Sequence, residues 1–205
     1  KIERMAPDET FLSGVVFLWN KIFNMKSIII TSLIVFTLNT NLFSQELLIG
    51  EERIEPGIVI IFEGAIKDHI VPLSMHLSEN QTNIHIEARV NWDIKNIPQG
   101  APLGGFIPYL HINAKVVNQT NGLSTFIDLL PHINLIDNFH YARNIALPGS
   151  VDDLYSVEFN IIAPAHTELA LHRDWIEQYK SFLNEEFNFF YKNINFEIIA
   201  RAKRR

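Results

Sequence analysis

Apolar and polar residues alternate with a period of two in several segments of the chain, and turn residues separate these segments. Such alternation is typical of β-strands that bury one face. In the clearest segment, 84–90, isoleucine, alanine and valine point one way, whereas His85, Glu87 and Arg89 point the other way. We therefore expect His85 and Glu87 to be neighbours on one face of a strand.

The same pattern predicts the other elements of the fold. Further strands are expected at 57–62, 106–117, 124–130, 154–163 and 187–199, and a helix at 174–186. The pattern contains no alternation of strands with helices and no internal repeat, which favours an all-β, immunoglobulin-like antiparallel β-sandwich, with a barrel as the alternative. No linker rich in proline or glycine divides 45–205, so we expect one domain there.

The N-terminal part of the chain has a different character. A basic residue, Lys26, precedes the apolar run 27–38, which is short for a bilayer span, and small residues lead to a polar segment after Ser44. This arrangement predicts a secretory signal peptide at 25–44, with an uncleaved membrane anchor as the alternative. Residues 1–24 are then interpreted as an upstream extension that is not part of the native protein.

Charge and cysteine content narrow the range of ligands. The formal net charge is −6, which argues against nucleic acid as a partner and favours cations. Four of the five residues in 201–205 are basic, and we expect a disordered basic tail there. The chain has no cysteine, so thiolate zinc sites and cysteine nucleophiles are excluded, and a bound metal must meet nitrogen and oxygen ligands.

Eight histidines make metal binding the first chemistry to consider, since imidazole suits copper(II), zinc, iron(II) and manganese. The alternating pair His85 and Glu87 aims an imidazole and a carboxylate in one direction. His132 and His140 bracket a segment that we interpret as a loop at the end of a sheet. His172 follows the last strand but one, where it can fold over an open end of the sandwich.

Other histidines carry less weight. Met75, His76 and His166 could offer further ligands, but we interpret them as ordinary surface residues. Asp137 is a candidate for a carboxylate that orients an imidazole without binding the metal itself.

Several motifs occur in the order found in one known family. They are 83–88 (Asn-Ile-His-Ile-Glu-Ala), 105–110 (Gly-Phe-Ile-Pro-Tyr-Leu), 130–132 (Leu-Pro-His), 140–141 (His-Tyr), 155–159 (Tyr-Ser-Val-Glu-Phe) and the late His172. With them the chain resembles the periplasmic iron-transport proteins over roughly 56–199. Members of that family are acidic, immunoglobulin-like accessory proteins of bacterial ferrous-iron uptake. They are typically dimeric and bind copper and iron or manganese beside an inner-membrane iron permease.

The resemblance implies a set of metal ligands. Carried over residue by residue, the family's site falls on His85, Glu87, His140 and His172, and an acidic position near the site falls on Glu63.

The family also uses a methionine after the proline of the 130–132 motif, and here that position is His132. An imidazole in place of a soft thioether weakens the preference for copper(I) and favours copper(II), zinc or iron(II).

These observations lead to one principal hypothesis and two alternatives. The first is a periplasmic metal-binding protein of an iron(II) uptake system that binds copper and iron, or manganese or zinc in their place. It is expected to act with an inner-membrane iron permease, to form a homodimer and not to be an enzyme. An immunoglobulin-like adhesion or assembly module with incidental histidines is the second hypothesis. A copper or zinc enzyme, such as a dismutase, is the third.

Overall fold

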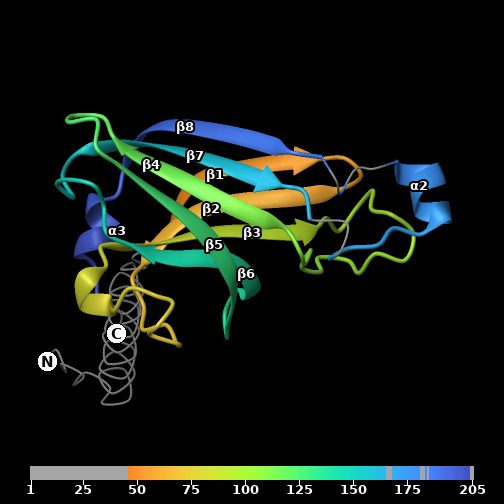
Figure 1. The fold of residues 1–205 in the computed structure, drawn as a ribbon, viewed down its shortest axis with the longest axis horizontal. Coiled ribbons are helices and arrows are strands. Elements are labelled where there is room, and N and C mark those ends of the chain that lie inside the picture. The colour runs from red at the N-terminus through yellow and green to blue at the C-terminus, as the bar shows by residue number, and fades with distance from the viewer. Residues whose placement is uncertain (1–45, 165–167, 181–182, 184, 204–205) are drawn as a thin grey trace, which may run out of the picture. The chain divides into compact units, whose positions relative to one another are not determined.

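Antiparallel strands form the framework of the protein in this computed structural model, which describes residues 46–164, 168–180, 183 and 185–203 (Figure 1). The described part of the chain has the strands β1 (Glu46–Ile54), β2 (Ile58–Ile66), β3 (Ile84–Trp92), β4 (His111–Asn118), β5 (Ser124–Asn134), β6 (Asn138–Ile145), β7 (Leu154–Ile162) and β8 (Phe187–Asn195). Three short helices accompany them: η1 (Glu79–Gln81), α2 (Arg173–Tyr179) and α3 (Glu197–Arg201).

The strands follow the order β1-β2-β3-β6-β5-β4-β7-β8. The strand β5 belongs to both layers, because its first part pairs with β4 from Ser124 to Leu129 and its last part pairs with β6 from Leu130 onward. A strand that passes from one sheet to the other in this way joins the two layers of a sandwich. The expected all-β antiparallel fold is confirmed.

The core lies between the two layers. Phe62 of β2 stacks on Phe159 of β7 with ring centroids 4.0 Å apart, and both side chains are fully buried. Phe189 and Tyr191 of β8 add tilted ring contacts to Phe62. Aromatic pairs of this kind contribute about 0.5–1.5 kcal/mol beyond the burial of their area. The inner face of the β1-β2-β3 layer is thus fixed by packing, which leaves its outer face available for a site.

A tyrosine at the start of β7 supports the immunoglobulin-like assignment. The hydroxyl of Tyr155 donates to the carbonyl oxygen of Ser150 at 2.6 Å, five residues upstream. In immunoglobulin-like sandwiches a tyrosine that bonds back across such a corner fixes the connection between two strands. Asn118 donates to Asp153 at 2.8 Å in the same corner and so holds the β4 end against it.

Several element predictions need correction. The strands β1 and β6 were not expected, and β4 begins at His111 rather than at Phe106. The segment before β4 contains Pro108, which cannot donate to a ladder, and Tyr109 at φ 66°.

The C-terminal region also differs from the prediction. The helix α2 ends at Tyr179, where Lys180 adopts a left-handed φ of 56°, and the expected last strand ends at Asn195 before α3. Arg201 lies in α3 and pairs with Asp152 and Glu197, so the first residue of the predicted disordered tail is ordered.

Residues 1–24 and the predicted signal peptide at 25–44 lie outside the described residues, as does His166. Within the described part of the chain, no helix is both long enough and apolar enough to cross a bilayer.

Candidate metal centre

The outer face of the β2-β3-β6 region carries the candidate ligands. On β3 the side chains alternate, so Ile84, Ile86 and Ala88 enter the core while His85 and Glu87 take the opposite face. The register places Glu63 of β2 opposite Glu87. Both His85 and Glu87 are only 2% exposed, so this strand is buried on both faces.

The segment that contains His132 and His140 is a hairpin, and its interpretation as an irregular loop was wrong. The two histidines face each other directly in the register of β5 and β6. The side chain of Asn134 accepts hydrogen bonds from the backbone N–H groups of Ile136 and Asp137 at 2.8 and 2.6 Å, which closes the turn. A tight turn between two ladder-paired strands is the physical reason why both imidazoles project from one side.

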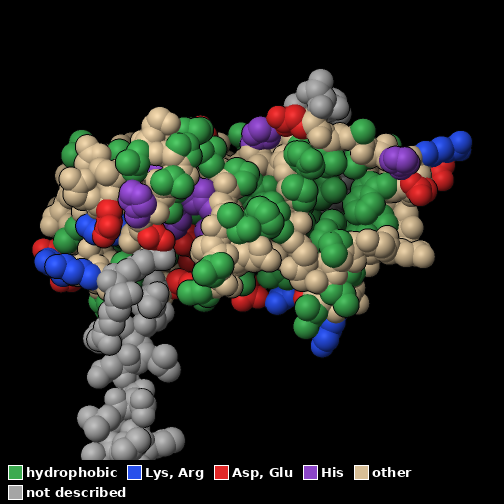
Figure 2. Space-filling view, turned by 90° about the horizontal axis from the view of Figure 1, so that it is seen from below, with side chains coloured by type: hydrophobic (Ala, Val, Ile, Leu, Met, Phe, Trp, Pro, Cys, Tyr) green, Lys and Arg blue, Asp and Glu red, His purple; other side chains and the backbone are tan. Residues whose placement is uncertain are grey.

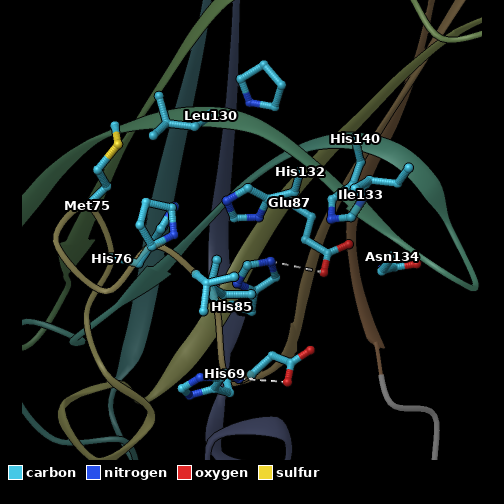
Figure 3. Close-up of a pocket in the computed structure, with 15 residues that line it drawn as sticks. His69, Met75, His76, His85, Glu87, Leu130, His132, Ile133, Asn134 and His140 are labelled. Atoms are coloured by element: carbon cyan, nitrogen blue, oxygen red, sulfur yellow. Dashed lines mark hydrogen bonds and ion pairs between the residues drawn. The ribbon is translucent and has the colours of Figure 1, made fainter.

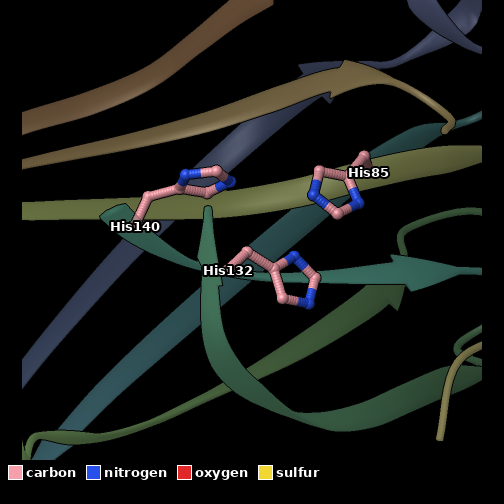
Figure 4. Close-up of side chains that lie close together, drawn as sticks. All are labelled: His85, His132 and His140. Carbon is pink, nitrogen blue, oxygen red and sulfur yellow. The ribbon is translucent and has the colours of Figure 1, made fainter. Parts of the chain in front are cut away.

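Three histidines from three strands converge at this point (Figure 4). Each of His85, His132 and His140 offers a ring nitrogen, and the three nitrogens lie within 4.8 Å of one another. Their ring centroids are 5.3 Å (His85 to His132), 5.9 Å (His132 to His140) and 6.3 Å (His85 to His140) apart. Metal–imidazole bonds of about 2.0–2.1 Å place a ring centre about 3.2 Å from the ion, so rings on one ion can lie up to about 6.4 Å apart. The observed separations are compatible with one shared ion.

Hydrogen bonds fix the protonation of two of these rings. Nδ1 of His85 donates to the side-chain oxygen of Asn144 at 2.9 Å, and Nδ1 of His140 donates to the backbone oxygen of Asn138 at 3.1 Å. Because each acceptor is an oxygen without a hydrogen, the proton resides on Nδ1 in both rings. Their Nε2 atoms therefore keep the lone pair that a metal requires. Outer hydrogen bonds of this kind orient metal-binding histidines in proteins generally.

His132 differs from the other two histidines because no hydrogen bond within the described residues orients its ring. Neither of its ring nitrogens has a hydrogen-bond partner among the described residues, although both atoms are buried. Burial, together with the neighbouring His85, His76 and His140, lowers the pKa of His132 to about 3. The ring is neutral at physiological pH, which is the form that binds metals.

Glu87 adds a carboxyl group beside the histidines. Its Oε1 lies 3.7 Å from Nε2 of His85, and its Oε2 is buried without a hydrogen-bond partner among the described residues. Desolvation, together with the nearby Asp137, Glu46 and Glu63, raises the pKa of Glu87 to about 8. In the absence of a cation this carboxyl group therefore holds a proton at neutral pH. A bound metal ion would remove the cause of the shift by supplying positive charge.

An acidic layer continues from Glu87 away from the histidines. Arg89 holds Glu63 at 2.7 Å and lies 3.6 Å from Asp137. Burial also raises the pKa of Glu63, although Arg89 opposes the rise. The sequence prediction that Glu63 lies near the site agrees with this placement, but its carboxylate pairs with Arg89 in the described structure. Asp137 meets Arg89 and Asn134 rather than an imidazole.

His172 is not part of this cluster in a single chain. It is the residue before α2, is exposed, and lines a different cavity with Trp92 and Trp175. Figure 1 shows α2 at one end of the sandwich, away from the β5-β6 hairpin. The structure therefore brings together His85, Glu87, His132 and His140, with Glu63 one strand further, and leaves His172 apart.

The cluster opens into a cavity of about 630 Å³ (Figure 3). Its second wall is the segment 67–83 between β2 and β3, which contributes His69, Met75 and His76. Seen from this side, histidine side chains reach the surface beside carboxylates (Figure 2). Sequence reasoning counted His76 as a possible further ligand but interpreted it as an ordinary surface residue. Its place in this cavity was missed because the segment has no periodicity and its position depends on long-range hydrogen bonds.

Asn144 is the second residue that sequence reasoning missed. Its side-chain oxygen accepts from His85, and its NH₂ group donates to the backbone oxygens of Asp68 and Leu77 at 2.8 and 3.1 Å. One buried amide thus orients a candidate ligand and holds segment 67–83, hereafter the covering segment, at two points. No local signal distinguishes such an asparagine from any other polar residue in a strand.

The fold and the site agree with the comparison against protein families. A family model described as "Fe2+ transport protein" matches residues 43–197, which is most of the chain. The chain belongs to this family. The resemblance stated from the sequence motifs is thereby confirmed.

Individual relatives of this chain are more distant. It is 28% identical over 132 residues to the 34 kDa membrane antigen of Treponema pallidum, and the match spans 62% of this chain and 61% of that relative. Copper-reconstituted P19 of Campylobacter jejuni is 26% identical, with a TM-score of 0.59 over 72% of this chain and 94% of that chain. Copper-bound FetP of uropathogenic Escherichia coli, at 21% identity, shares the fold, with a TM-score of 0.56 over 73% of this chain and 98% of that chain.

Proposed function

We propose that the protein is a periplasmic metal-binding component of an iron(II) uptake system and that it holds copper and iron at the site of His85, His132, His140 and Glu87. The observation that carries the proposal is the convergence of three imidazole nitrogens, one each from β3, β5 and β6, within 4.8 Å of one another. Membership of the Fe2+ transport protein family and the likeness to copper-reconstituted P19 support it.

The donor set suits a borderline divalent cation. Neutral imidazoles prefer copper, zinc or iron, and a carboxylate adds affinity for the harder ions such as iron(II) and manganese. Two of the imidazoles are oriented by hydrogen bonds before any ion arrives. The third imidazole and the Glu87 carboxyl group have buried atoms without partners among the described residues, which a cation would satisfy.

The arrangement fits binding and transfer better than catalysis. Val71 and Met75 line the cavity and are exposed, so the cavity reaches solvent and an ion can enter and leave without unfolding of the strands. Protonation competes with the metal at every ligand, and the affinity should fall in acid. We propose that the ion, or iron handled with it, is passed to an inner-membrane iron permease.

The replacement His85→Ala tests this function. We expect copper(II) affinity to fall by about 100-fold or more, because loss of a ligand exceeds the 10–100-fold cost of losing an outer hydrogen bond. Calorimetric titration of the purified protein with copper(II), zinc(II), manganese(II) and anaerobic iron(II) measures the change. In cells that depend on the permease for iron(II), the same variant should lower iron accumulation at limiting iron.

The matched control is His111→Ala. His111 is exposed at the start of β4, where it pairs with Glu168 at 2.7 Å outside the cavity, so its loss should leave the affinity unchanged. If the wild-type protein binds none of these metals, the proposal is wrong and an adhesion or assembly module becomes the better account.

We also propose that the protein forms a homodimer through the β5-β6 hairpin. The hairpin exposes large apolar side chains, with Ile133 65% and Ile136 83% exposed and Leu135 fully so. Contiguous apolar surface of this kind marks an interaction site. The family resemblance places His172 among the ligands. Because His172 lies apart from the cluster in a single chain, we propose that the second chain of the dimer supplies it.

The double replacement Leu135→Asp and Ile136→Asp should convert this dimer into a monomer. Two charges on an interface that is closed by apolar contacts are costly to desolvate, and the two side chains bury little within their own chain. Light scattering coupled to size-exclusion chromatography measures the mass. Thr120→Asp, on the β4-β5 turn, is an equally polar control. A wild-type protein that is monomeric at high concentration would contradict the proposal.

A further inference from the structure

A fourth imidazole approaches the candidate metal centre from outside the strands. The ring of His76 lies 4.9 Å from the ring of His132, centroid to centroid, at an interplanar angle of 65°. This is the shortest of the ring separations that involve His132. The Nδ1 atom of His76 is buried and has no hydrogen-bond partner among the described residues.

The separation is compatible with a shared ion. Two imidazoles on one ion place their ring centres up to about 6.4 Å apart, and 4.9 Å lies within this range. His76 does not belong to the group of nitrogens that lie within 4.8 Å of one another at the inner site. The pair His76 and His132 therefore describes a second position for an ion, nearer the mouth of the cavity.

The two positions share His132, and a neutral imidazole has only one nitrogen with a free lone pair. His132 is neutral and can accept the proton on either nitrogen, because neither atom is committed to a hydrogen bond among the described residues. It can thus bind an ion at the outer position or at the inner position, but not at both. Occupancy is expected to be one ion per chain.

The covering segment is built to present His76. Asn144 donates to the backbone oxygens of Asp68 and Leu77, so the stretch between them is held at both ends. The backbone N–H of Met75 donates to Pro72 at 3.0 Å, which forms a turn immediately before His76. Met75 also lines the cavity, 52% exposed, and brings a thioether beside the imidazole (Figure 3). Imidazole with thioether is a copper-binding combination.

We propose that His76 and His132, with the thioether of Met75 beside them, form an outer copper position through which an ion reaches the inner site of His85, His132, His140 and Glu87. The inference rests on the proposed function, since it assigns an entry step to that same site. His132 is the residue common to both positions and changes partners as the ion moves inward.

The test isolates the outer position by removing the inner one. In the variant His85→Ala with His140→Ala, copper(II) should still bind at one equivalent per chain, more weakly than in the wild type. Electron paramagnetic resonance should show coupling to two nitrogens. Adding His76→Ala should abolish this residual binding, whereas adding His111→Ala should leave it unchanged. Circular dichroism confirms that each variant is folded.

A kinetic measurement covers the case in which the double variant does not fold. In an otherwise unchanged protein, His76→Ala should slow transfer of copper(II) from copper nitrilotriacetate by several-fold, with a smaller effect on the equilibrium affinity. Unchanged transfer kinetics, or residual binding that survives His76→Ala in the double variant, would overturn the outer position while leaving the inner site standing. Absence of copper binding by the wild type would instead refute the proposed function.

Discussion

The replacement of Glu87 by glutamine is expected to remove most of the pH dependence of stability in the metal-free protein above pH 6.5. The pKa of Glu87 is raised to about 8 in the folded state from an ordinary value of 4.5. The folded protein therefore keeps a proton that the unfolded chain has lost. Stability falls by about 1.4 kcal/mol per pH unit until the folded group ionises near pH 8, and then levels off.

The histidines of the site act outside this pH window. Burial lowers the pKa values of His76, His132 and His140. These three groups therefore reduce the stability of the fold only as pH falls below 6.5, where the histidines of the unfolded chain gain protons. The pKa of Glu63 is also raised, so Glu63, like Glu87, makes the fold less stable as pH rises.

Urea unfolding in the presence of a chelator, at several pH values between 6.5 and 9, measures the slope directly. A wild-type protein with constant stability across this range would show that Glu87 is already ionised without a metal. A second readout is the proton released when copper(II) binds at pH 7. Calorimetry in buffers of different ionisation enthalpy should detect the release in the wild type and find it reduced in Glu87→Gln.

The replacement His132→Met should shift the metal preference from copper(II) toward copper(I). A thioether is a softer ligand than imidazole, and His132 offers one of the three converging ring nitrogens, so the change alters the coordination directly. We expect the ratio of copper(I) to copper(II) affinity to rise by at least about tenfold, which corresponds to an increase of about 59 mV in reduction potential. Voltammetry of the copper-loaded protein measures this shift.

His132→Leu is the control for His132→Met, since leucine matches the size of methionine but has no sulfur. It should weaken binding of both oxidation states without raising the potential. If the methionine variant keeps the wild-type potential, His132 does not bind the ion at the inner site. The outer position would lose its shared ligand by the same result.

The alternating segments of the chain were sufficient to predict much of the fold. In β3 the separation of core side chains from His85 and Glu87 follows from the period of two alone, and the structure has this separation. The strand β6 was missed because its pattern of side chains is mixed and its position depends on pairing with β3, more than 50 residues earlier. Local sequence carries little information about a partner at that distance.

The candidate site shows the same division. Sequence reasoning selected His85, His132 and His140, which converge in space. It did not foresee that His132 and His140 face each other across a hairpin, nor that His76 reaches them from the covering segment. Sequence reasoning could not identify Asn144, because the role of this amide comes from three partners that are distant in sequence.

Because β5 passes from one layer to the other, a bound metal ion should change how readily the β5-β6 hairpin opens. The hairpin end of β5, with His132, is the part that has left the β4 layer, and its ladder partner is β6, which in turn pairs with β3. An ion held by His85 and His132 would act as a reversible crosslink between segments 47 residues apart in the chain. The loaded protein should therefore resist opening of the hairpin, and release of the ion should loosen the same hairpin that we propose meets the partner subunit.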